Sequence, residues 1–189
     1  MITTESVSLL SPESGCYVLK EKWWDWGGGD IYNQSGTVVG HMHRRVLSLR
    51  AFTEISDRDG SFLFSVEKKL ISMRPSYMLK DHQENVLGRT NKKILTLFRP
   101  QLWLEDENGR KMLEAQGNLL GRNFEIKDMD NKAVAHVGKS DFFRDLFLGG
   151  TIFDFRDTYA IRMLDREYDR RLILGFVVAI DNSVHDKDK

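Results

Sequence analysis

The sequence has one cysteine, three prolines and no net charge, and each of these features narrows what the protein can be. Cys16 has no second cysteine to bond, so no intramolecular disulfide supports the fold, as expected for a reducing, intracellular location. The 28 basic and 28 acidic residues cancel, which argues against bulk attraction to nucleic acid. The longest apolar run covers residues 172–180, far short of the roughly 20 residues of a transmembrane helix. We predict a cytoplasmic protein without a transmembrane span, with peripheral membrane association as an open alternative.

Signatures of catalysis are also missing. The sequence contains no Gly-x-Ser-x-Gly elbow, no HExxH and no phosphate-binding P-loop. We therefore expect no enzymatic activity and no cofactor. The 189 residues, 41% of them apolar, suit one globular domain. We place this domain at residues 16–183, after a flexible N-terminal arm (1–15) and before a polar tail (184–189).

What the sequence does contain is a repeated unit, in which alternating apolar residues surround a polar turn. The turn-opening residues recur at spacings of 24, 24, 25 and 22, at Asn33, Asp57, Asp81, Asp106 and Asp128. Asn or Asp opens a turn by bonding the backbone ahead of it. Three positions later, where a turn requires positive φ, stand Gly36, Gly60, Glu84, Gly109 and Asn131. Each unit is predicted to be an antiparallel hairpin, which gives about ten strands, and "TIFDF" (151–155) and "DTYAIRM" (157–163) add two more.

The C-terminal segment loses this alternation and is apolar on every side between Leu172 and Ile180. It predicts a buried helix, capped by Asp165 and with acidic residues in its first turn, or alternatively a buried strand. Either element needs a surrounding shell, which twelve strands provide by closing into a barrel. The predicted fold is mainly β: a closed antiparallel barrel of about twelve strands around a buried, hydrophobic C-terminal helix.

The opening stretch "EKWWDWGGGDIYNQSG" (21–36) combines three tryptophans with three consecutive glycines. Lys20–Trp26 is interpreted as a first strand, the glycines as a turn and Asp30–Asn33 as the return strand. The alternative is a phosphate-cradling loop built from backbone N–H groups. No "GKS/T" or spaced GxGxxG follows, and a strand rather than a helix comes next, so the plain hairpin is favoured.

Basic residues close several of the repeats, at Arg44 and Arg45, Lys68 and Lys69, Lys92 and Lys93, and Lys139. Because equivalent positions of adjacent hairpins line up on a barrel, these seven are candidates for a band that binds an acidic lipid headgroup. Alternatively, they are solvated strand ends that discourage edge pairing.

Two further patterns are candidate sites. His41 and His43 share one strand face, but no third ligand stands nearby, so we expect surface histidines and no metal. In "KSDFFRDLFLGGTIFDF" (139–155), Phe143 and Phe147 are candidates for contact with a membrane interface, and core packing is their commoner role.

The order of these segments resembles the tubby C-terminal-like superfamily and, within it, the LURP-one-related proteins, which are relatives of the phospholipid scramblases. The resemblance covers Tyr17 to Ser183, and its carrying segments are "YVLKEKWWDWGGGDIYNQSG", the hairpin units and "DTYAIRMLDREYDRRLILGFVVAID". It implies a twelve-stranded barrel wrapped around the C-terminal helix. It also implies phosphoinositide binding through basic side chains outside the barrel, as in tubby-type domains. The acidic, proline-containing calcium segment of scramblases has no counterpart here.

These observations predict a non-enzymatic binding or adaptor module. Its expected partner is an anionic membrane phospholipid, such as a phosphoinositide, or another protein. One alternative is a scramblase-like lipid-transfer protein that uses calcium. A further alternative is a barrel that binds a small molecule or a metal.

Overall fold

In the computed structural model the described part of the chain forms twelve β-strands and one helix. The structure describes residues 8–21, 28–45, 52–69, 76–94, 100–119, 123–139 and 158–185. The elements are β1 (Cys16–Glu21), β2 (Gly29–Asn33), β3 (Val38–Arg45), β4 (Phe52–Asp57), β5 (Phe62–Lys68), β6 (Tyr77–Asp81), β7 (Val86–Ile94), β8 (Pro100–Glu105), β9 (Lys111–Asn118), β10 (Asn123–Lys127), β11 (Ala133–Lys139), β12 (Thr158–Met163) and α1 (Arg170–His185).

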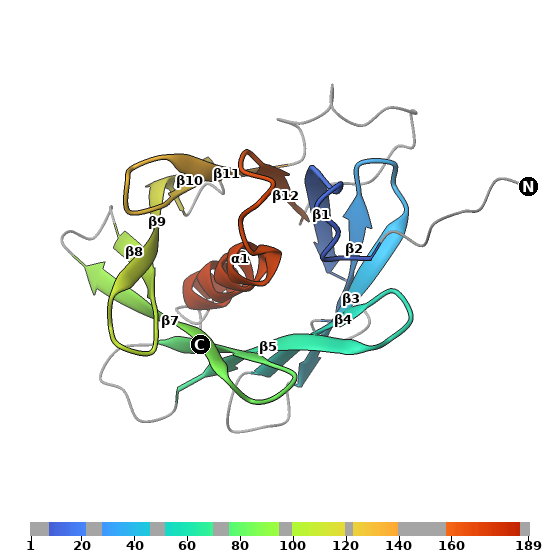
Figure 1. The fold of residues 1–189 in the computed structure, drawn as a ribbon, viewed down its shortest axis with the longest axis horizontal. Helices are drawn as coiled ribbons and strands as arrows, with labels where there is room; N and C mark the ends of the chain where they lie inside the picture. Colours follow the sequence, from blue (N-terminus) through green and yellow to red (C-terminus); the bar gives the residue numbers. More distant parts are fainter. Residues whose placement is uncertain are drawn as a thin grey trace, which may run out of the picture.

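The strands form a closed antiparallel barrel. Each strand pairs with its neighbours in sequence, and β12 closes the ring by pairing with β1, so that Tyr17 lies opposite Ile161. Figure 1 shows the strands arranged around α1. Closure leaves no unpaired edge among the described strands, and the predicted twelve-stranded barrel is confirmed. The first strand, predicted at Lys20–Trp26, begins earlier, at Cys16. Gly29, predicted to belong to the turn, is the first residue of β2. The segment "TIFDF" and residues 22–27 lie outside the described residues.

A tight turn joins the two strands of each of the five hairpins, and the five turns share one hydrogen-bonding pattern. The N–H of each anchor donates to the carbonyl four residues later, and the N–H of the residue three positions on donates to the anchor's carbonyl. That residue has φ between 61 and 87° in all five turns. The register shifts by one residue beside every turn, which is the signature of a β-bulge. The predicted hairpins are confirmed at Asn33, Asp57, Asp81, Asp106 and Asp128.

Helix α1 fills the barrel, as predicted. Its residues from Ile173 to Ile180 face the strands and, Gly175 apart, are buried hydrophobic side chains. Gly175 permits a close approach to β6, because a Cβ at this position would lie 2.6 Å from Leu79 Cδ2. No helix among the described residues has both the length and the hydropathy needed to cross a bilayer.

The start of α1 differs from the prediction. Asp169 caps the helix, since its Oδ1 accepts the N–H of Arg171 at 2.9 Å, and the first turn of α1 contains no acidic residue. Asp165, the predicted cap, lies in the preceding turn, where its carboxylate accepts the N–H of Glu167 and forms an ion pair with Lys132 at 2.6 Å. The Asp165 prediction is wrong because the turn, rather than the helix, occupies the residues after it.

Residues 8–15, assigned to a flexible arm from the sequence, pack against the barrel in the structure. Leu9 is fully buried, and its carbonyl accepts a hydrogen bond from Tyr17 Oη at 2.8 Å. Asp57 accepts the N–H of Leu9 at 3.0 Å and the hydroxyl of Ser8 at 2.8 Å. This segment therefore lies at the end of the barrel that carries the five turns and the start of α1, which we call the turn end.

Candidate functional site: the basic end of the barrel

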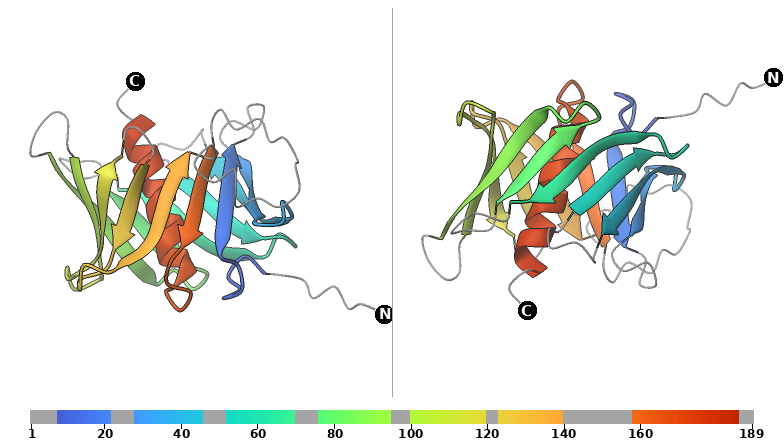
Figure 2. Two further views of the ribbon diagram at one scale, coloured as in Figure 1. Left: turned by 90° about the horizontal axis from the view of Figure 1, so that it is seen from above. Right: turned by 90° about the horizontal axis from the view of Figure 1, so that it is seen from below.

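The opposite end of the barrel carries the predicted basic pairs. Odd-numbered strands all run toward this end because neighbours in the barrel are antiparallel. Arg44 and Arg45 end β3, Lys68 ends β5 with Lys69 directly after it, and Lys92 and Lys93 lie near the end of β7. We call this end, defined by these six residues, the basic end. Figure 2 shows α1 running from the turn end to the basic end, where it terminates.

Strand alternation divides each basic pair between two sides of the barrel wall. Arg44, Lys68 and Lys92 continue the inner rows of β3, β5 and β7, which contain buried residues such as Met42, Val66 and Thr90. Lys92 is only 8% exposed. Their successors Arg45, Lys69 and Lys93 are exposed. The expected exterior band therefore consists of two sets, three inner bases and three outer bases.

The last member of the predicted band is Lys139, at the end of β11. It lies opposite Tyr159 in the register, at the same end of the barrel, and its side chain lies outside the described residues. The predicted membrane-contact residues Phe143 and Phe147 also lie outside the described residues.

The inner bases share the basic end with the last turn of α1. Asp181 and Asn182 are both buried there. A helix C-terminus carries about half a negative charge, so cations are favourable beside it. The Nδ2 atom of Asn182 is buried and has no hydrogen-bond partner. The sequence analysis did not identify Asn182 as a candidate residue. The one signal in the sequence is its spacing of seven residues from Gly175, which places both on the same helix face.

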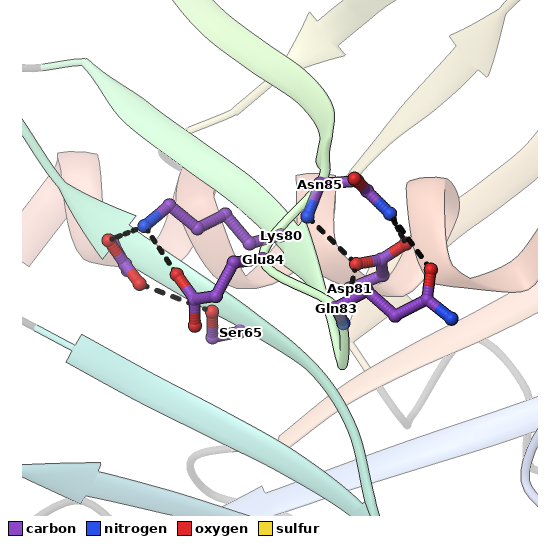
Figure 3. Close-up of polar contacts among 7 residues, drawn as sticks. Ser65, Lys80, Asp81, Gln83, Glu84 and Asn85 are labelled. Atoms are coloured by element: carbon purple, nitrogen blue, oxygen red, sulfur yellow. Dashed lines mark hydrogen bonds and ion pairs between the residues drawn. The ribbon is translucent and has the colours of Figure 1, made fainter.

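The outer wall from β3 to β6 is charge-balanced. Arg45 pairs with Glu54 at 2.9 Å and lies over the ring of Phe52 at 5.4 Å. Lys80 pairs with the carboxylate of Glu84 at 2.9 Å (Figure 3) and with that of Glu67 at 3.1 Å. The hydrogen bond to Glu84, followed by the contacts with Glu67, raises the pKa of Lys80 despite its partial burial. These bases already have acidic partners, so this wall offers less charge to a ligand than the sequence indicates.

The two histidines do not form a metal site with their described surroundings. His41 Nδ1 lies 2.8 Å from a carboxylate oxygen of the buried Asp30, and His43 is exposed on the same strand face. Within the described residues, no group of three or more His, Cys, Asp or Glu side chains could hold a metal ion. Asp30 therefore orients the His41 ring, which leaves Nε2 as its remaining polar atom.

The single cysteine is packed into the wall and is not activated. Cys16 is 4% exposed, and burial raises the pKa of its thiol against the opposing effects of Arg162 and Arg166. A raised pKa decreases the thiolate fraction, which is the reactive form. The geometry at Cys16 is that of a structural residue.

Comparisons with known proteins agree with this architecture. No curated protein gives a significant match to the sequence. Among solved structures, the X-ray structure of the Arabidopsis thaliana protein AT5G01750 is similar, with a TM-score of 0.60 at 12% identity, covering 95% of this chain and 98% of that chain. At this identity the likeness shows the fold alone. A family model described as LURP-one-related matches residues 16–181. The chain belongs to the LURP-one-related family.

Proposed function

We propose that this protein is a non-enzymatic binding module that engages anionic phospholipid headgroups through the basic end of its barrel. The supporting observation is that three basic pairs, spaced one hairpin apart along the chain, meet at one end of the barrel. Clustered lysines and arginines attract acidic lipid surfaces by roughly 1 kcal/mol each near the membrane. The protein as a whole is neutral, so this attraction depends on where the charges lie.

The two ends of the barrel differ in what they can offer a membrane. At the turn end, residues 8–15 and the five turns cover the barrel, and the exposed cations there are interspersed with turn aspartates such as Asp106 and Asp128. At the basic end, Lys69 and Lys93 are exposed on the outer side of the wall. The basic end is therefore the surface that we expect to face an anionic bilayer, from the cytoplasm.

The test is co-sedimentation of the purified protein with vesicles of phosphatidylcholine alone, with phosphatidylserine or with a phosphatidylinositol bisphosphate. It is run at two salt concentrations, because surface attraction weakens with ionic strength. Runs with and without calcium address the lipid-transfer alternative raised by the scramblase resemblance. We expect salt-sensitive binding to the anionic vesicles.

A matched pair of variants locates the binding. One variant neutralises four lysines of the basic end: Lys68→Met, Lys69→Gln, Lys92→Met and Lys93→Gln. The control removes four exposed cations of the turn end: Arg58→Gln, Arg110→Gln, Lys111→Gln and Lys132→Gln. We expect the first variant to lose vesicle binding and the control to keep it. If neither anionic vesicle sediments the wild-type protein, the proposal fails, and an acidic protein surface becomes the partner to search for.

A further inference from the structure

The outer wall formed by β7, β8 and β9 differs from the neighbouring wall in how its cations are used. Between β3 and β6, Arg45 and Lys80 are paired with carboxylates. On β7, Arg89 and Lys93 are exposed, and the side chain of neither bonds to another residue in the described part of the chain. They are four residues apart and therefore lie on the same face of the strand. Figure 1 shows β7 and β8 on the side of the barrel away from β1 and β2.

The strand register places a tryptophan beside the midpoint between these two cations. Asn91 is the residue midway between Arg89 and Lys93 on the outer face of β7, and Trp103 of β8 lies directly opposite it. On its other side, Trp103 lies opposite Glu114 of β9. We use the name Trp103 patch for six residues of this wall: Arg89, Asn91, Lys93, Trp103, Glu105 and Lys111.

Glu105 holds the indole of Trp103 in place. One of its carboxylate oxygens accepts the Nε1–H of Trp103, and the other accepts the side-chain amide of Asn91. Glu105 also lies directly opposite Arg89 in the register, yet these two side chains do not form an ion pair. The carboxylate best placed to neutralise Arg89 is therefore used to orient Trp103.

A second contact fixes the ring from the β9 side. Lys111 Nζ lies 4.7 Å from the centroid of the Trp103 ring and 3.8 Å from a carboxylate oxygen of Glu114. Trp103 is half-buried, so part of its ring stays accessible. A side chain that is already ordered loses little conformational entropy when a partner packs on it, and tryptophan and arginine are enriched at binding hot spots. The patch is therefore organised before any partner binds.

The charges of this wall favour an acidic partner. Its charged outer-facing residues on β7, β8 and β9 are the cations Arg89, Lys93 and Lys111 and the carboxylates Glu105 and Glu114. Both carboxylates have partners within the wall, whereas two of the three cations have none among the described residues. The flanking strands leave this balance unchanged, because Lys80 of β6 and Lys127 of β10 are each paired with a carboxylate.

The spacing of the two cations selects an extended segment. Four residues of a β-strand span about 13 Å, so carboxylates four residues apart in an extended chain match the separation of Arg89 and Lys93. The side chain midway between those carboxylates points the same way and meets Trp103. In a helix, residues four apart are separated by only about 6 Å along the axis. The described strands close into a barrel without a free edge, so recognition here uses side chains instead of strand addition.

A protein segment fits this wall better than an anionic bilayer does. The carboxylates of Glu105 and Glu114 lie beside Trp103 at the centre of the wall, where they repel a continuous sheet of negative headgroups. A peptide places its carboxylates at two points only, against Arg89 and Lys93, and it can place an apolar side chain at the centre.

We propose that the Trp103 patch docks an extended acidic segment of a protein partner. Arg89 and Lys93 bind carboxylates four residues apart, and an apolar side chain between them packs on Trp103. This surface lies on the barrel wall and is independent of the lipid binding proposed for the basic end, with Lys93 as the one residue common to both.

The first experiment is an NMR titration of the full ¹⁵N-labelled chain with the capped peptide Thr-Glu-Thr-Ile-Thr-Glu-Thr. The matched probe carries glutamine in place of both glutamates. The indole N–H signal of Trp103, identified by its loss in Trp103→Phe, reports occupation of the patch. We expect the acidic peptide to shift this signal saturably and the glutamine peptide to bind at least fivefold more weakly. No shift, or equal binding of the two peptides, would overturn the proposal.

The second experiment compares the two unpaired cations with two matched ones elsewhere. Arg89→Gln with Lys93→Gln removes the cations of the patch, and Arg58→Gln with Arg162→Gln removes two other exposed arginines. We expect the first variant to bind the acidic peptide at least tenfold more weakly and the second to bind it as the wild-type protein does. The melting temperature should change in neither, because none of these side chains has a hydrogen-bond partner among the described residues. Equal losses in the two variants would mean that net charge alone attracts the peptide.

A vesicle measurement separates this surface from the basic end. Arg89→Gln alone should sediment with phosphatidylserine vesicles as the wild-type protein does, since Arg89 lies outside the basic end. If Arg89→Gln loses vesicle binding and keeps peptide binding, the wall is a lipid surface and the docking proposal fails. Absence of vesicle binding in the wild-type protein defeats the proposed function and leaves the peptide result to decide this one.

Discussion

At the turn end of the barrel, the buried cation Arg170 is surrounded by acceptors from its own chain. Its guanidinium donates to Tyr17 Oη at 3.0 Å, to the carbonyls of Arg166 and Pro12 at 2.8 Å, and to that of Ser14 at 3.5 Å. At the basic end, three inner bases lie near the end of α1, where the amide of Asn182 lacks an acceptor. The cation at the turn end is used to build the fold. At the basic end, by contrast, the side-chain nitrogen of Asn182 is a buried donor that the described part of the fold does not use.

The two termini of α1 also differ in how the helix dipole acts on nearby cations. Arg170 stands at the N-terminus of α1, where the helix dipole disfavours a cation, so local hydrogen bonds must stabilise it. The bases of the basic end stand near the C-terminus, where the dipole favours them. A cation retained against the dipole therefore indicates a structural network, as the four hydrogen bonds of Arg170 do.

The largest effect is expected from Arg170→Met. The change leaves four acceptors around an apolar side chain, and we expect a loss of about 3 kcal/mol in the free energy of unfolding, measured by urea denaturation. Arg170→Lys keeps the charge but lacks the planar fork, so it should recover only part of the loss. Lys92→Met should cost less than Arg170→Met. Equal losses at Arg170 and Lys92 would contradict the assignment of structure to one end and binding to the other.

We expect a smaller loss of unfolding free energy from a substitution that pushes residues 8–15 away from the barrel. In Gly40→Val, the Cβ would lie 2.7 Å from the carbonyl oxygen of Ser56 and 2.9 Å from Leu9 Cδ2. Overpacking of this kind costs about 2 kcal/mol, and it should expose residues 8–15 to limited proteolysis. Gly15→Ala is the control, because a Cβ there meets no atom closer than 3.7 Å. Unchanged proteolysis of the Gly40→Val variant would mean that Leu9 does not hold this segment.

The fold was predictable because its repeat is local. Each turn opens with an Asn or Asp whose N–H bonds the carbonyl four residues later, as at Asn33 and Asp106. The regular spacing of these residues along the chain is enough to recognise the turns. Even Glu84, an unusual residue for a turn's positive-φ position, has the predicted backbone conformation, with φ of 65°. The repeat also located the basic pairs on equivalent strand ends.

The parts that could not be predicted depend on contacts between distant segments. Leu9 is buried because Asp57 and Tyr17 bind its backbone, and no periodicity in residues 1–15 indicates this. The division of each basic pair into inner and outer members depends on the phase of the strand relative to the core. Asn182 is part of the candidate site only because the helix lies inside the barrel beside β5 and β6.

The turns themselves allow a narrower comparison, between Asp57 and Asp128. Asp128 Oδ1 accepts the N–H groups of Asp130 and Lys132 within its own turn. Asp57 accepts the N–H of Arg58 within its own turn and, in addition, accepts from Ser8 and Leu9, forty-eight residues or more away. We expect Asp57→Ala to lose about 1.5 kcal/mol and to release residues 8–15, measured by urea unfolding and proteolysis, and Asp128→Ala to lose less and leave that segment protected. Release of the segment in the Asp128 variant would show that the turns act together.

The smallest expected effect is the dependence of stability on pH in acid, which we expect to arise from carboxyl groups at the turn end. The backbone N–H of Arg110, followed by other contacts of that residue, lowers the pKa of Asp106, and the amide of Asn85 lowers that of Asp81. A carboxyl group whose pKa is lower in the folded state contributes stability above its ordinary pKa of about 4, and this contribution disappears as the pH falls through the folded value. Asp106→Asn keeps a turn-opening acceptor, as Asn33 does naturally, and should therefore make the loss of stability in acid shallower. Urea unfolding between pH 2 and 6 compares this variant with the wild-type protein. An equally steep loss of stability in acid for Asp106→Asn would show that the Asp106 carboxylate does not contribute to the acid limb.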